Sequence, residues 1–82
     1  MRVTSVNLRK IEDKGNIKAY ATIILDDCLA IHGIKLIKGK ERDFIAFPNE
    51  KGKDGKYYDH VHPIVSSLRD EIETAILQKY NN

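Results

Sequence analysis

The sequence predicts an α+β fold in which an antiparallel β-meander is covered by one C-terminal α-helix. Two patterns predict it. Apolar and polar residues alternate with a period of two through the first half of the chain, as in strands with one buried face. Near the C-terminus, apolar residues recur every three or four positions, as in a helix with one buried stripe. A chain of 82 residues has room for one core, so we expect a single domain over residues 1–82.

The first two expected strands form a hairpin. In residues 2–11, Val6 and Leu8 fall on one face while the polar residues between them fall on the other. Residues 17–25 alternate in the same way, with small and branched apolar residues on one side. Residues 13–16 read Asp-Lys-Gly-Asn, a composition typical of turns. The sequence therefore predicts two antiparallel strands joined by a short turn.

The third expected strand, residues 28–37, changes its pattern in the middle. Ile31 and Ile34 have opposite parity, and the change occurs at His32-Gly33. A glycine at such a change is typical of a β-bulge, which would let both isoleucines face the core. A short fourth strand, residues 44–47, is expected to complete the meander before Pro48.

The remaining chain is predicted to form a loop and then a helix. Asn49 to Lys56 is polar and contains the turn signal Asp54-Gly55, while residues 57–62 are expected to be extended. Pro63 suits the first position of a helix, where its missing N–H costs nothing. The expected buried stripe of that helix consists of Val65, Leu68, Ile72, Ala75 and Ile76.

The size and cysteine content of the chain indicate self-association. A domain this small buries only about 60% of its unfolded surface, and such chains usually need a disulfide, a metal or a partner subunit. Cys28 is the only cysteine, so an intrachain disulfide is excluded, and a lone thiol fits a reducing compartment. We expect Cys28 to be a small buried apolar residue and not a nucleophile. We therefore expect a homodimer that pairs through its sheet. With no membrane span and no signal-type segment in the sequence, a cytoplasmic location is expected.

Catalysis and metal binding find little support in the residue pattern. His60 and His62 are two apart, so both imidazoles would point the same way from an extended segment, with Asp59, His32 and Cys28 as possible further ligands. This spacing matches no recognised zinc pattern. The sequence also contains no nucleophile turn and no phosphate-binding glycine loop. We expect neither an enzyme nor a bound cofactor.

The distribution of charged residues favours nucleic-acid binding and protein interaction almost equally. Cations cluster at the end of the first strand, around the turn before residue 44 and in the polar loop, as phosphate contacts require. Acidic residues are interleaved with them, however, and the net charge is only +2. A module that binds other proteins, with no nucleic-acid ligand, fits the same residues. Scattered tyrosines give no signature of an RNA-stacking sheet.

Several segments together resemble the stage V sporulation protein G (SpoVG) family of septation regulators. The resemblance spans Met1 to Tyr80 and rests on the segments 1–10 (MRVTSVNLRK), 23–26 (IILD), 31–34 (IHGI), 44–48 (FIAFP), 54–55 (DG) and 62–64 (HPI), and on Asp59. It implies a dimeric β-sheet protein with a C-terminal helix that binds DNA and RNA. It also implies a regulatory role in septation, sporulation or gene expression. The alternative is a protein-interaction module of the septation machinery.

The predicted nucleic-acid site combines the polar loop with nearby cations. A homodimer is expected to present the loop lysines, the end of the first strand and one arginine near the helix start to the phosphate backbone. The family usually has a Lys-Arg pair where this chain has Glu50-Lys51, and often Arg where it has Tyr58. The predicted site residues are Arg9, Lys10, Lys51, Lys53, Lys56 and Arg69.

Overall fold

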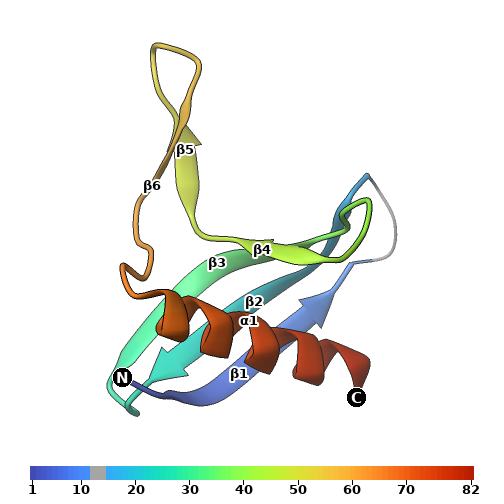
Figure 1. Ribbon diagram of the computed structural model, residues 1–82, viewed down its shortest axis with the longest axis vertical. Helices are drawn as coiled ribbons and strands as arrows, with labels where there is room; N and C mark the ends of the chain where they lie inside the picture. The colour runs from blue at the N-terminus through green and yellow to red at the C-terminus, as the bar shows by residue number, and fades with distance from the viewer. Residues whose placement is uncertain (12–14) are drawn as a thin grey trace.

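The computed structural model describes residues 1–11 and 15–82, and it shows an antiparallel sheet with one helix across it (Figure 1). The predicted α+β meander is therefore confirmed. The first two residues of the turn expected at residues 13–16 lie outside the described residues. The elements in chain order are β1 (Val3–Lys10), β2 (Ile17–Leu25), β3 (Leu29–Ile37), β4 (Phe44–Ala46), β5 (Asn49–Lys51), β6 (Tyr57–Asp59) and α1 (Ser66–Asn81).

The core lies between α1 and one face of the four-stranded sheet, whose order is β1-β2-β3-β4. Alternation places every second residue of β2 on the helix side, and Ile72 and Ile76 of α1 pack against these residues. The opposite face of the sheet is not covered by a helix (Figure 1). The buried residues are Ala19, Ala21, Ile23, Leu25, Ile31, Ile34, Leu36, Ile45, Phe47, Ile72 and Ile76.

The bulge predicted in β3 is confirmed. Ile23 pairs with Ile31 and Ala21 with Ile34, so one residue of β2 lies opposite two residues of β3. Gly33 has a φ of +79°, in the left-handed region that favours glycine. As a result, Ile31 and Ile34 are both buried on the same side of the sheet.

Residues 49–59 form a second small sheet, so the prediction of a loop over residues 49–56 was wrong at its beginning. Asn49 pairs with Asp59 and Lys51 with Tyr57, which makes β5 and β6 a hairpin. Figure 1 shows this hairpin extending away from the main sheet. The expected turn is confirmed at the tip, where Gly55 has a φ of +85°. Backbone pairing, which needs no apolar alternation, holds the polar strands together.

The helix begins at Ser66, three residues after the position predicted from Pro63. Val65 is extended, with φ −109° and ψ 125°, and its carbonyl accepts the N–H groups of Leu68 and Arg69. Residues 60–65 form an irregular connection with bends, which leads the chain from the hairpin to the start of α1. Val65 is 55% exposed and does not belong to the buried stripe. No helix in residues 1–11 and 15–82 is long and apolar enough to span a membrane.

Candidate nucleic-acid interface and apolar groove

Three of the predicted site residues lie together on the β5–β6 hairpin. Lys51 ends β5, while Lys53 and Lys56 belong to the connection between the two strands. All three residues are exposed. Within the described part of the chain, none of them forms an ion pair with a carboxylate. The hairpin therefore presents three cations on a narrow projection that can approach a polyanion.

Two acidic residues of the hairpin, Glu50 and Asp54, contact nearby side chains. Glu50 Oε1 lies 3.5 Å from His60 Nε2, across the two strands. Asp54 accepts the Tyr58 O–H at 2.5 Å and the Lys56 N–H at 3.0 Å, and these bonds lower the pKa of the Asp54 carboxyl. The same Tyr58 bond raises the pKa of the phenol. Thus Glu50 and Tyr58, the two departures from the family pattern, both take part in contacts within the hairpin.

Arg69 lies near the base of the hairpin, apart from its tip. Its guanidinium carbon is 5.3 Å from the centre of the Phe47 ring. Phe47 lies just before β5 in the chain. Arg69 is exposed on the first turns of α1. Arg69 therefore lies beside the segment of chain that leads into the hairpin.

Arg9 and Lys10 do not join the hairpin lysines within one chain, and they point to opposite faces of the sheet. The Arg9 guanidinium lies 5.6 Å from the Tyr20 ring centre on the face away from the helix. The Lys10 ammonium lies 4.8 Å from the ring centre of Tyr80, which belongs to α1. Figure 1 shows the end of β1 far from the tip of the β5–β6 hairpin. The opposite orientation of Arg9 and Lys10 could have been predicted from the sequence, because consecutive residues of a strand face opposite sides of the sheet.

Lys10 belongs to a small cationic and aromatic group at the end of the helix. Lys18 also lies over the Tyr80 ring, at 4.7 Å, and its ammonium donates to Asp43 Oδ2. This bond to the carboxylate raises the pKa of Lys18. The group joins β1, β2 and α1 and acts as a packing contact at this corner of the fold.

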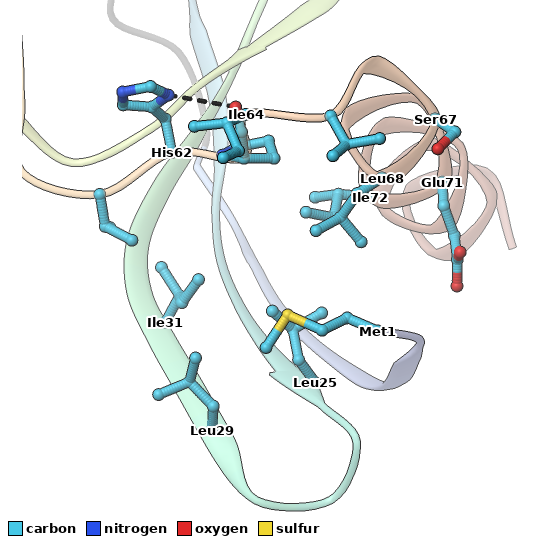
Figure 2. Close-up of a pocket in the computed structure, with 13 residues that line it drawn as sticks. Met1, Leu25, Leu29, Ile31, His62, Ile64, Ser67, Leu68, Glu71 and Ile72 are labelled. Carbon is cyan, nitrogen blue, oxygen red and sulfur yellow. Dashed lines mark hydrogen bonds between the residues drawn. The ribbon is translucent and has the colours of Figure 1, made fainter.

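An apolar groove of about 500 Å³ lies between the end of the sheet and the start of α1 (Figure 2). Leu29 and Ile31 of β3 face Leu68 of α1 across it, and Met1 lies beside Leu25. Many of its apolar side chains are exposed. They are Ile64 at 89%, Met1 at 65%, Val65 at 55%, Leu29 at 45% and Val61 at 36%.

Sequence reasoning missed this groove because it combines three distant segments of the chain. The sequence feature that could have indicated the groove is the apolar pair Ile64-Val65 just before the helix. The predicted buried stripe of the helix does not account for both residues. His62 also lines the groove, and its Nδ1 lies 3.1 Å from the carbonyl oxygen of Pro63 (dashed in Figure 2). The groove contributes an apolar docking surface, with little polar chemistry inside it.

The candidate metal ligands do not converge. His60 contacts Glu50, whereas the His32 ring bonds to the Thr22 hydroxyl at 3.1 Å on the open face of the sheet. Among residues 1–11 and 15–82, no three histidine, cysteine or acidic side chains are close enough to hold a metal ion. The free thiol of Cys28 is exposed at the β2–β3 turn, so its predicted burial was wrong.

The chain matches the SpoVG family model over residues 1–82. Similar proteins carry the name "Putative septation protein SpoVG". The one from Agathobacter rectalis is 44% identical over 80 residues, which cover 98% of this chain and 92% of the relative. The one from Caldicellulosiruptor saccharolyticus is 40% identical, with 98% and 91% covered. The one from Staphylococcus carnosus is 41% identical, with 99% and 76% covered.

Proposed function

Because the chain belongs to the SpoVG family, we propose that it is a non-catalytic regulator of septation and sporulation that binds DNA or RNA as a homodimer. The names of its relatives support the link to septation. The resemblance and the position of the cations support the nucleic-acid ligand. The observation that carries the proposal is the projecting β5–β6 hairpin, with three exposed lysines and two acidic neighbours, Glu50 and Asp54, that contact His60 and Tyr58.

The hairpin suits phosphate contact in shape as well as in charge. Among the residues that the structure describes, β5 and β6 pair only with each other, so neither outer edge of the hairpin is paired with another strand. Arg69 continues the cationic path from the hairpin to the start of α1. In this proposal Lys51, Lys53 and Lys56 contact the backbone phosphates, and Arg69 makes a further contact near the hairpin base.

The apolar groove supports the proposed homodimer. Five exposed apolar side chains around one hollow would be costly to leave in water on so small a protein. A second copy of the chain would cover them and add to the core that an 82-residue fold can build alone. The dimer would also place two hairpins in one particle, which doubles the cations available to one nucleic acid.

Replacing Lys51, Lys53 and Lys56 with alanine tests the hairpin. We expect weaker binding to a duplex and a flatter dependence of log K on log salt, by about 0.9 for each phosphate that the variant no longer neutralises. The measurement is fluorescence anisotropy of a labelled duplex between about 50 mM and 200 mM salt. The matched control replaces Lys38, Lys40 and Lys79, which are exposed and lie off the hairpin, with the same change in net charge.

Equal slopes for the two triple variants would remove the hairpin from the binding site. If the unaltered protein shows no salt-sensitive binding to DNA or RNA at micromolar concentration, the nucleic-acid proposal fails. The protein-interaction module of the septation machinery would then be the better account.

A further inference from the structure

The open face of the four-stranded sheet carries a row of residues suited to a nucleobase and its phosphates. Strand register places Arg9 of β1, Tyr20 of β2 and Lys35 of β3 side by side. Directly opposed residues of neighbouring strands project from the same face, so the tyrosine lies between two cations. This face is the one that α1 leaves uncovered. The row thus joins an aromatic ring to positive charge on an accessible surface.

The surface next to Tyr20 is hollowed. A shallow depression of about 470 Å³ runs along β1 and β2 and is bordered by Asn7, Arg9, Tyr20, Thr22 and Gly33. The β3 bulge puts Gly33, which has no side chain of its own, at the border of this depression. Asn7 and Thr22 supply hydrogen-bonding groups on one side of the Tyr20 ring. The Thr22 hydroxyl also contacts the His32 ring. The depression therefore combines polar and apolar lining, in contrast to the mostly apolar groove beside α1.

The charges of this face match a polyanion. The described residues that the register and the Thr22–His32 contact place on it are Ser5, Asn7, Arg9, Ile17, Tyr20, Thr22, Ile24, Ala30, His32, Lys35, Ile37, Phe44 and Ala46. None of them is acidic. Arg9 is exposed and Lys35 is partly exposed, so both can meet phosphates without first breaking an ion pair within the described chain.

We propose that the Arg9–Tyr20–Lys35 row binds a single-stranded segment of DNA or RNA, with one base stacked on Tyr20. Arg9 and Lys35 hold the phosphates on either side of that base. An aromatic ring on a sheet can stack an unpaired base but cannot reach a base inside a duplex, so the surface selects single strands. The proposal rests on the nucleic-acid binding proposed above and adds a second surface, distinct from the hairpin. In this proposal Arg9 contacts phosphate on the open sheet face, because it lies too far from the hairpin to contribute to that surface within one chain.

The test compares Tyr20→Leu with Tyr20→Phe. Both keep an apolar side chain in the strand, but only phenylalanine keeps a ring for stacking. We expect Tyr20→Leu to weaken binding of a single strand of about 12 nucleotides by roughly 5- to 100-fold. Tyr20→Phe should bind within about twofold of the unaltered protein. Duplex binding should be unchanged in both variants. Arg9→Gln should flatten the salt dependence on the single strand by about 0.7.

Thermal unfolding by circular dichroism checks that each variant is folded, and parallel titrations with oligo-deoxythymidine and oligo-uridine separate DNA from RNA. Equal single-strand affinity of folded Tyr20→Leu and Tyr20→Phe would overturn the proposal. If Tyr20→Leu instead dissociates a dimer and leaves oligonucleotide affinity unchanged, the face is an interface between copies, and the proposal is again wrong. A failure of the hairpin proposal looks different, because there the Lys51, Lys53 and Lys56 replacement leaves duplex binding intact.

Discussion

The side chain of Glu71 connects α1 to β1. Its Oε2 accepts the backbone N–H of Val3 at 2.9 Å and lies 3.4 Å from Nε of Arg2. The bond from Val3, followed by the charge and bond of Arg2, lowers the pKa of the Glu71 carboxyl. Val3 lies at the start of an edge strand, where its N–H would otherwise face water. The junction of β1 and α1 is therefore stabilised more strongly when the carboxyl group is ionised.

Replacing Glu71 with glutamine should lower Tm at neutral pH, and the difference from the unaltered protein should shrink in acid. A depressed folded-state pKa gives stability that is complete above the unfolded value near 4.5 and is lost as pH falls through the lower folded value. Thermal unfolding from pH 7 down to about pH 3 measures this. The control is Asp70→Asn, which removes an exposed charge from the same helix turn. A Glu71→Gln difference that stays constant across this range would contradict the account.

Single residues also show what the sequence could predict and what it could not. The bulge at Gly33 was predictable because the parity change and the glycine coincide, and only one arrangement buries both Ile31 and Ile34. The separation of Arg9 from Lys10 was equally available from strand alternation. Their distance from the hairpin was not, because the direction in which residues 49–59 leave the sheet depends on packing at Phe47 and beyond.

At the scale of elements, α1 owes its place to a short buried stripe. Ile72 is 1% exposed and Ile76 is fully buried, while Leu68 and Ala75 are half-buried beside them. The 3-to-4 spacing predicted these four positions correctly and failed only at Val65, which precedes the helix. Helix periodicity therefore predicted correctly which residues of α1 contact the sheet. It did not predict where α1 begins, because Pro63 is compatible with an extended segment as well as with the first turn of a helix.

Replacing Ile72 with alanine should destabilise the fold by about 2–5 kcal/mol, through reduced burial and the cavity left against β2. This is a large part of the ~5–15 kcal/mol that holds a typical domain. Urea denaturation followed by circular dichroism measures the change. Thr74→Ala on the exposed side of the same helix is the control and should stay within about 0.5 kcal/mol. A loss below about 1 kcal/mol for Ile72→Ala would show that α1 is not packed on the sheet as described.

The β5–β6 hairpin is the element that sequence patterns described least well. Its strands contain Glu50, Lys51 and Tyr58, which give no clear alternation, so the segment resembled a polar loop apart from its turn. Two-stranded hairpins that pack on nothing else are marginally stable in water. Here the Glu50–His60 and Asp54–Tyr58 contacts reinforce it. A hairpin held by polar contacts is suited to display charge to a ligand.

The whole molecule has three surfaces with different chemistry. The hairpin is cationic, the open sheet face combines cations with Tyr20, and the groove between the sheet and α1 is apolar. A second copy on the groove would leave the other two surfaces free for nucleic acid. The sequence predicted a homodimer from the size of the chain, but it predicted pairing through the sheet. We propose the groove as the interface instead, because five exposed apolar side chains surround one hollow there.

Replacing Ile64 with aspartate should weaken the dimer without unfolding the subunit. Ile64 is 89% exposed in the single chain, so its removal costs the subunit little, whereas a buried unpaired carboxylate at the interface is strongly unfavourable. Size-exclusion chromatography over a range of protein concentrations measures the shift. Thr74→Asp, which adds the same charge outside the groove, should leave the dimer intact. Equal elution of the two variants at every concentration would exclude the groove as the interface.

The solution mass of the unaltered protein tests the homodimer most directly, since the doubled set of hairpins depends on it. Sedimentation equilibrium at micromolar concentration should give twice the 9.4 kDa mass of one chain, and an added oligonucleotide should bind to that pair of chains. A particle that stays at 9.4 kDa at every concentration, with and without oligonucleotide, would contradict it.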